Sequence, residues 1–183
     1  MKAITVCLGF NKNLEEAVAT YVELFNNVFG NSKILGRSYF GEQEITALRQ
    51  VPEMSEDIMP GVAGDVKTIR FTLNGEEVVA FRGGACFGKF HESMSLYVSC
   101  ETQEQIDRLW EVLSEDGEEQ PCGWVKDRFG VSWQIVPSFV WEVDQGPDRQ
   151  KAERMNIALF GMKRIDIAAL KAAIGDRSNE MCG

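Results

Sequence analysis

A run of polar side chains at every second position is the feature of this sequence that could do chemistry. Ser93, Ser95, Tyr97 and Ser99 alternate with apolar residues. This period of two is typical of a half-buried strand, so we expect the hydroxyl groups to lie on one face. An amphipathic helix over 102–116 follows, and a similar strand-to-helix pattern opens the chain. The sequence therefore predicts a duplicated module whose paired sheets enclose a cavity.

The first module begins with a predicted strand over 3–10, with Ile4, Val6, Leu8 and Phe10 on one face. A helix with turn residues at its start and Gly30 at its end follows, and then a second strand over 33–40. Segment 41–64 contains two prolines, two methionines and acidic residues without a sustained period. We expect this segment to be a mobile loop or a lid.

The clearest hairpin of the sequence spans 67–82. Its Asn74-Gly75 dipeptide tolerates the positive φ angles of a two-residue type I′ turn. That turn places Phe71 opposite Val78 and Arg70 opposite Val79, and opposed residues share a face. One predicted face is apolar and packs under the first helix: Ile69, Phe71, Leu73, Val78 and Ala80. The mixed face suits a cavity wall: Thr68, Arg70, Thr72, Glu77, Val79 and Phe81.

A second hairpin is predicted around the turn 127–130. If Gly130 takes the left-handed position after a type I turn, Trp124 lies opposite Gln134 and faces the cavity, while Trp133 packs beneath the helix. A tighter loop would reverse Trp124. We favour the first register, which predicts a pocket suited to a small planar or partly polar organic ligand. Its expected lining is Thr5, Arg70, Phe81, Ser93, Ser95, Tyr97, Trp124 and Gln134.

Arg70 is the sharpest single candidate for binding an anionic ligand. Its guanidinium could pair with a carboxylate or phosphonate across the cavity floor. The alternative is an internal ion pair with Glu77, one residue pair away on the same face. We favour the ion pair over the ligand contact.

The amino-acid composition limits the classes of partner that this protein can be expected to bind. The 28 acidic and 19 basic side chains give a formal net charge of −9, which disfavours nucleic acid and anionic membranes as partners. The five cysteines show no paired CxxC spacing, so reduced thiols fit better than a disulfide framework or a zinc site. Neither a signal-like segment nor an apolar run of membrane-spanning length is present in the sequence given. We expect a cytoplasmic protein.

Several short segments of the chain resemble the PhnB-like group of the vicinal oxygen chelate, or glyoxalase/bleomycin-resistance, superfamily. This group is also described as a 3-demethylubiquinone-9 3-methyltransferase domain. The resemblance spans most of the chain and includes a terminal signature at 162–166. The segments that carry it are 8–10 (LGF), 17–25 (AVATYVELF), 73–75 (LNG), 82–84 (RGG), 95–98 (SLYV), 106–110 (IDRLW), 122–127 (CGWVKD), 129–137 (FGVSWQIVP) and 162–166 (MKRID).

The resemblance implies an α+β fold of two βαβββ modules forming an incomplete β-barrel, commonly completed as a homodimer. Metal-dependent members of the superfamily hold a divalent ion with His, Glu or Gln side chains from both modules. Alignment with them puts Thr5 and Ser93 at the histidine-type positions and Val79 and Gln134 at the glutamate-type positions. A valine offers no ligand atom, and hydroxyl or amide groups bind a divalent ion weakly. We therefore expect no metal and no cofactor.

Two classes of function stay open, with catalytic residues unknown. One is a protein that binds or sequesters a small molecule, as the antibiotic-binding relatives do. The other is an enzyme of the superfamily in which Gln134, Ser93, Tyr97 or His91 orients a small polar or aromatic substrate. A methyltransferase lacks support, because no glycine-rich cofactor loop opens the first helix. We expect His91 to be a partly exposed strand-edge residue, and Cys122 to be a structural thiol.

The predicted organisation has three parts. The first module covers 1–86, a shorter second module covers 87–140, and a C-terminal helical extension covers 141–183. Helical patterns run from Asp148 to about Met162 and from Asp166 to Ile174, and the residues after 175 are predicted to be disordered. A third hypothesis for the protein is a purely associative dimerisation module built from these tail helices.

Overall fold

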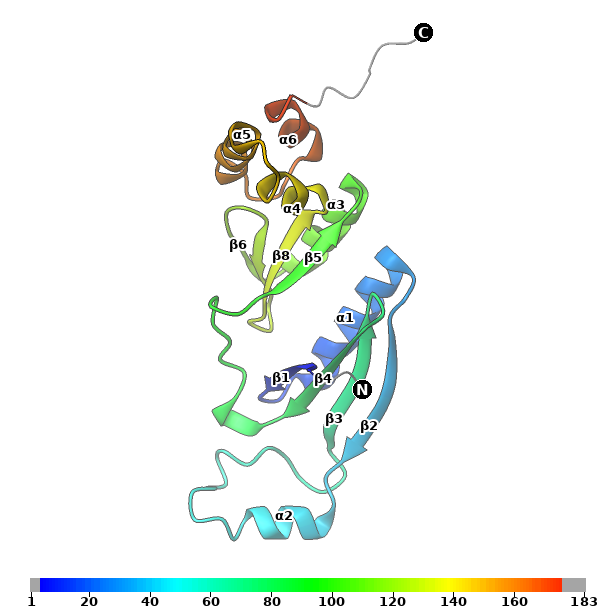
Figure 1. Cartoon of the computed structure of the whole chain (residues 1–183). Helices are drawn as coiled ribbons and strands as arrows, with labels where there is room; N and C mark the ends of the chain where they lie inside the picture. Colours follow the sequence, from blue (N-terminus) through cyan, green and yellow to red (C-terminus); the bar gives the residue numbers. More distant parts are fainter. Residues whose placement is uncertain (1–3, 176–183) are drawn as a thin grey trace. The chain divides into compact units, whose positions relative to one another are not determined.

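The computed structural model describes residues 4–175, which divide into two compact units with a boundary between Phe90 and His91. Each unit contains one four-stranded sheet and a long helix (Figure 1). The predicted disorder after residue 175 lies outside the described residues. Within 4–175, neither sheet closes into a barrel by itself.

Unit 1 has the order β1, α1, β2, α2, β3, β4, in which α2 interrupts a βαβββ module. The sheet order is β1-β4-β3-β2, with β1 parallel to β4 and the other pairs antiparallel. The elements are β1 (Val6–Phe10), α1 (Leu14–Phe29), β2 (Lys33–Tyr39), α2 (Glu42–Leu48), β3 (Val66–Leu73) and β4 (Glu76–Arg82), followed by a single 3-10 turn at Gly84–Cys86.

The β3–β4 hairpin has the predicted register. Phe71 pairs with Val78 and Arg70 with Val79, and both turn residues, Asn74 and Gly75, have positive φ angles of 47° and 83°. The predicted apolar face is buried throughout, and α1 packs against β3 and β4. Helix α1 ends as predicted at Gly30, which is left-handed and donates its N–H to the Asn26 carbonyl oxygen at 2.8 Å.

One prediction for unit 1 is wrong. Ile4 does not join the buried face of β1, because it precedes the strand and is 89% exposed. Segment 41–64 contains a helix, α2, whose Ile45 is buried, and its role as a mobile loop or a lid stays a prediction. Backbone hydrogen bonds from Phe40 to Asp65 and from Gly64 to Phe40 fasten the two ends of the segment together. The segment is therefore a closed excursion from the sheet, with structure of its own.

Unit 2 repeats the same topology in the order β5, α3, β6, β7, β8 and adds three tail helices. Its sheet order, β5-β8-β7-β6, corresponds strand for strand to that of unit 1. The elements are β5 (Leu96–Cys100), α3 (Gln103–Ser114), β6 (Glu118–Glu119), β7 (Trp124–Lys126), β8 (Ser132–Pro137), α4 (Phe139–Asp144), α5 (Arg149–Phe160) and α6 (Ile167–Ala173). The predicted α+β fold of two βαβββ modules is confirmed.

The tail helices are part of the core of unit 2. They bury a cluster with the end of β8, formed by Val136, Val140, Met155, Ile165, Leu170 and Ile174. In addition, the N–H groups of Cys122 and Gly123 donate to the carbonyl oxygens of Met162 and Lys163 at 2.7 and 2.8 Å. Helices α5 and α6 match the predicted helical patterns, whereas α4 was not predicted. Figure 1 shows these helices gathered beside the sheet of unit 2.

Candidate functional site

The second hairpin places three predicted pocket residues in one row across the sheet of unit 2. Trp124 pairs with Gln134 in the antiparallel β7–β8 ladder, and Tyr97 pairs with Gln134 in the parallel β5–β8 ladder. Paired residues of neighbouring strands point to the same side of a sheet. We call this side the Gln134 face. The opposite side, which contacts α3, includes the fully buried Trp133, as predicted.

Asp127 fixes the β7–β8 register that places these residues in one row. The sequence pattern alone did not predict this role. Its Oδ1 accepts hydrogen bonds from the N–H groups of Phe129 and Val131 at 2.9 and 3.0 Å. Its Oδ2 accepts one from Trp133 Nε1 at 2.8 Å. Gly130 has a φ of 89°, the left-handed conformation that the favoured register requires. An aspartate at the start of a turn is the sequence signal for this arrangement.

Ser95 orients the amide of Gln134. Gln134 Nε2 donates to Ser95 Oγ at 2.7 Å. Within residues 4–175, Gln134 Oε1 has no protein hydrogen-bond partner. The amide is therefore held in one orientation, with its carbonyl oxygen available as an acceptor.

Tyr97 lies at the boundary between the Gln134 face and the tail. Its ring lies 5.5 Å from that of Trp141 of α4, centroid to centroid, and packs against the tail cluster. Burial raises the pKa of Tyr97 to about 12. The phenol is protonated at neutral pH and can donate a hydrogen bond, and the tail covers this end of the face.

Ser93 does not lie on a strand, which corrects the sequence prediction for 93–100. Strand β5 starts at Leu96, and Ser93 is an exposed turn residue. His91 Nδ1 lies 3.0 Å from both Ser93 N and Ser93 Oγ, so the imidazole contacts its own turn. His91 is exposed, and it lies in this turn and not at the edge of a strand.

Lys126, Glu92 and Ser132 also belong to the polar environment of the Gln134 face, and the predicted pocket lining omitted them. Lys126 Nζ lies 2.8 Å from Glu92 Oε1, an ion pair that lowers the pKa of Glu92 and raises that of Lys126. Ser132 pairs with Lys126 across the β7–β8 ladder and is 1% exposed. Lys126 follows Trp124 by two residues and Ser132 precedes Gln134 by two, so the period of two along each strand places them on the Gln134 face. This spacing is the sequence signal that could have identified both residues.

In unit 1, Arg70, Val79 and Phe81 share the mixed face of the β3–β4 hairpin, as predicted. Arg70 Nε donates to Glu77 Oε1 at 2.8 Å, so the internal ion pair that the sequence favoured is present. Phe81 stacks edge-to-face on Phe87 with ring centroids 4.8 Å apart. A Cβ at Gly9 would lie 2.8 Å from the Phe81 ring and 2.7 Å from the Phe87 ring, so a larger residue at this position of β1 would displace the rings.

Thr5 precedes β1 as a half-buried residue whose Oγ1 has no partner within the described residues. The superfamily's divalent ion does not fit this chain, because the aligned positions hold a threonine, a valine, a turn serine and a glutamine already bonded to Ser95. Across residues 4–175, no group of three or more His, Cys, Asp or Glu side chains could hold a metal ion.

Cys122 does not have the properties of an activated nucleophile. Burial raises the pKa of its thiol above the ordinary value, so the thiolate is disfavoured at neutral pH. The two groups that could have approached it are engaged elsewhere: Lys126 with Glu92, and Asp127 with Trp133. Its left-handed backbone, with a φ of 61°, forms a bend whose N–H donates to the Met162 carbonyl oxygen of the tail.

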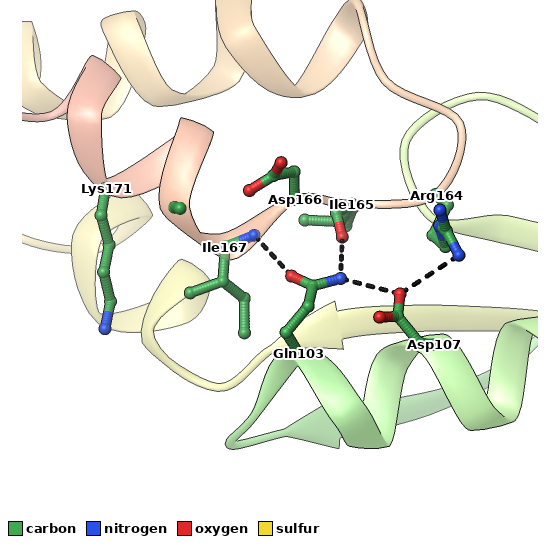
Figure 2. A pocket seen from close by; sticks show the side chains of 8 residues that line it. Gln103, Asp107, Arg164, Ile165, Asp166, Ile167 and Lys171 are labelled. Carbon is green, nitrogen blue, oxygen red and sulfur yellow. Dashed lines mark hydrogen bonds and ion pairs between the residues drawn. The ribbon is translucent and has the colours of Figure 1, made fainter.

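A separate pocket of about 590 Å³ lies between α3 and the start of α6. Figure 2 shows that Gln103 and Asp107 are held by contacts within this pocket. The amide of Gln103 accepts from the N–H of Ile167 at 2.9 Å and donates to Ile165 O and Asp107 Oδ1 at 3.0 Å each, while Arg164 pairs with Asp107 at 3.3 Å. These contacts fasten the tail to α3, which is a structural role.

Within 4–175, no helix has the length and hydrophobicity needed to cross a membrane. No curated protein has significant sequence similarity to the chain.

Among solved structures, a PhnB protein from Bacillus cereus, named for a 3-demethylubiquinone-9 3-methyltransferase, is 31% identical over 74% of this chain and 99% of its own, with a TM-score of 0.54. Protein PA1353 from Pseudomonas aeruginosa is 18% identical over 73% of this chain and 96% of its own, with a TM-score of 0.48. A protein from Staphylococcus aureus is 27% identical over 73% of this chain and 95% of its own, with a TM-score of 0.28.

The sequence model of the 3-demethylubiquinone-9 3-methyltransferase family matches residues 2–136. This match covers both βαβββ modules and stops before the tail helices, so the resemblance seen at 162–166 lies beyond it. The chain belongs to the 3-demethylubiquinone-9 3-methyltransferase-like, or PhnB-like, family of glyoxalase-like proteins.

Proposed function

We propose that this protein binds a small, planar organic molecule on the Gln134 face without the help of a metal ion. The observation that carries the proposal is the row Tyr97, Gln134 and Trp124, in which an oriented amide is flanked by two aromatic residues on neighbouring strands. Aromatic surface with a few well-placed polar groups is typical of sites for small organic ligands.

The polar groups of the row define what the ligand must offer. Gln134 Oε1, which has no protein partner among residues 4–175, can accept a hydrogen bond from an N–H or O–H group of the ligand. The Tyr97 phenol is protonated at neutral pH, and its raised pKa keeps it so at higher pH, so it offers a donor in return. An aromatic ring that carries an amide or a hydroxyl group meets both requirements.

Four residues of unit 1 also stay predicted ligand residues, each considered within its own unit: Thr5, Arg70, Val79 and Phe81. Of these, Arg70 has the most to offer an acidic ligand, since its side chain is 46% exposed and held by one ion pair. Ser93 contributes through its exposed turn.

Methyl transfer is not part of the proposal. A nucleotide-type methyl donor needs a glycine-rich loop that leads from a strand into a helix. In unit 1, Asn11–Asn13 connects β1 to α1, and Gly83-Gly84 leads only into a single 3-10 turn. Neither connection in unit 1 is therefore a loop of the kind that binds such a methyl donor, although the family is named for a methyltransferase.

We also propose a cytoplasmic homodimer. Cys7, Cys86, Cys100 and Cys122 are all free thiols, which fits a reducing compartment. The dimer is what the family resemblance implies, and light scattering of the purified full chain measures it: a mass near twice the 20.5 kDa of the chain supports the dimer, and the monomer mass contradicts it.

A thermal-shift experiment with neutral aromatic probes tests the binding function. We expect benzamide and phenol to raise the melting temperature in the presence of a chelator, because ligands that bind the folded state stabilise it. Trp124→Ala and Gln134→Ala should each remove this shift.

The matched controls are Phe160→Ala and Gln50→Ala, which change an exposed aromatic side chain and an exposed amide elsewhere. Both should keep the shift. A shift that survives both Trp124→Ala and Gln134→Ala would place the ligand away from the Gln134 face and contradict the proposal.

A further inference from the structure

The segment 91–95, just before β5, holds the polar groups of the Gln134 face with its own side chains. The carboxylate of Glu92 lies 2.8 Å from Lys126 Nζ, and the hydroxyl of Ser95 lies 2.7 Å from Gln134 Nε2. Residues 91–95 belong to no strand, so these two side-chain contacts hold the segment where a sheet ladder does not. The chain thus supplies a carboxylate and a hydroxyl to its own candidate site.

Beside this contact lies a buried hydroxyl with an unused hydrogen-bonding capacity. Ser132 is 1% exposed, and within the described residues its Oγ has no partner. Leaving a buried polar group unpaired is destabilising, so a group that reached Ser132 would be bound more tightly for it. Ser132 faces Lys126 as its cross-strand neighbour, at a typical Cβ separation of about 5 Å. One acidic group can therefore contact both side chains.

We propose that Glu92 and Ser95 occupy the places of ligand groups, and that the ligand of the Gln134 face is an aromatic hydroxy acid. The ligand carboxylate replaces that of Glu92 beside Lys126 Nζ and also accepts a hydrogen bond from the Ser132 hydroxyl. The ligand hydroxyl replaces that of Ser95 as the acceptor for Gln134 Nε2, and the ring of the ligand packs on Trp124. This inference rests on the proposed function, which it deepens by naming the chemical class of the ligand.

The exchange of one carboxylate for another is energetically easy. The side chains of Lys126 and Glu92 are 31% and 40% exposed, and ion pairs at such partly hydrated positions contribute little to stability. When the ligand enters, Lys126 keeps a carboxylate partner and Glu92 regains water. The ligand then gains the contact with Ser132, which Glu92 does not make.

The arrangement makes an unusual prediction: removing the charge of Glu92 should improve binding. We expect Glu92→Gln to tighten the binding of para-hydroxybenzoate by up to about fivefold. The ligand then no longer has to displace a charged carboxylate from its weak ion pair with Lys126. The affinity for neutral para-hydroxybenzamide should not change. Glu111→Gln is the matched control, since it breaks the exposed Arg108–Glu111 pair on α3 and should affect neither probe.

Two further variants test the acid-binding groups directly. Lys126→Met and Ser132→Ala should each lower the affinity for para-hydroxybenzoate by about tenfold, as expected when a hydrogen bond to a charged group is lost. Para-hydroxybenzamide, whose neutral amide oxygen makes weaker hydrogen bonds than a carboxylate, should lose clearly less affinity in each variant. Lys163→Met, which removes an exposed lysine of the same unit, should leave both affinities unchanged.

The titrations are run on the full chain by NMR of the tryptophan indole N–H groups, at about 0.15 M salt, where the Debye length of about 8 Å limits repulsion between the acidic protein and an anion. An unchanged or weaker para-hydroxybenzoate affinity in Glu92→Gln would overturn the inference. If neutral probes still bind through Trp124, the proposed function survives that result. If no aromatic probe binds, both fail.

Discussion

At the scale of single residues, Asp127 has the largest structural influence on the candidate site. The backbone N–H groups of Phe129 and Val131 and the indole N–H of Trp133 all donate to its carboxylate. Asp127 is only 5% exposed, so these bonds replace water almost completely. The turn geometry that they fix determines which side of the sheet Trp124 occupies.

Asp127→Asn should therefore destabilise the protein although it changes few atoms. An amide NH₂ at the Oδ2 position cannot accept from the Trp133 indole, and an unpaired buried donor costs about 1–3 kcal/mol. Denaturant unfolding measures this loss. Asp116→Asn is the control, because Asp116 is exposed and asparagine tolerates its left-handed φ of 54°. Equal stability of the two variants would show that the Asp127 bonds contribute nothing.

At the scale of secondary-structure elements, the tail helices lie beyond the match to the family model. The family match ends at residue 136, yet α5 and α6 supply the fully buried Met155 and Leu170 to the cluster around Val136. These side chains complete the core of unit 2. The hypothesis that the tail serves only for dimerisation therefore does not describe this chain well. Deleting 148–183 would remove core residues together with any dimer contact.

Two substitutions in α5 separate the core role of the tail from its surface. Met155→Ala should cost about 2–5 kcal/mol in the free energy of unfolding, because it leaves a cavity in a packed cluster. Ile157→Ala, on the same helix but 64% exposed, should stay within about 0.5 kcal/mol of the unmodified protein. If Met155→Ala were as stable as Ile157→Ala, the tail would not be integral to the folded unit.

The elements that the sequence predicted well are those with strong local signals. Asn74-Gly75 determines its hairpin register through backbone conformation alone, and the apolar stripes of α1 and α3 are long enough to be unambiguous. The elements that it missed are short: α2 has seven residues, α4 six and β6 two. Elements of this length owe their stability to tertiary contacts more than to a periodic pattern.

The start of β5 shows how side-chain contacts can override a periodic pattern. The alternation of Ser93, Ser95 and Tyr97 predicts one continuous strand, but the chain turns at Ser93. The Glu92–Lys126 pair and the Ser95–Gln134 hydrogen bond join partners 34 and 39 residues apart in sequence. No local pattern could have predicted them, and they are also what the inference about the ligand depends on.

At the scale of the whole molecule, one topology occurs twice with different consequences. Both sheets place their parallel pair first in the order, β1 with β4 and β5 with β8. Unit 1 uses its mixed face for the Arg70–Glu77 pair and the Phe81–Phe87 stack, whereas unit 2 keeps an oriented amide between two aromatic residues. The functional potential of the fold is therefore clearest in unit 2.

The candidate site was partly predictable from its amino-acid pattern. Strand parity and the left-handed Gly130 turn correctly predict that Trp124 lies opposite Gln134. The tail contact of Tyr97 and the unpaired hydroxyl of Ser132 within the described residues depend on the packing of distant segments, which parity does not describe.

The most direct test of metal-free binding at the Gln134 face is the indole N–H signal of Trp124 during titration with benzamide. The protein has four tryptophans, and Trp124→Phe assigns the signal of interest. We expect a saturable shift of the Trp124 signal in the presence of a chelator, with the buried Trp110 and Trp133 signals almost unchanged. A Trp124 signal that stays fixed, or that moves only after a divalent ion is added, would contradict the account.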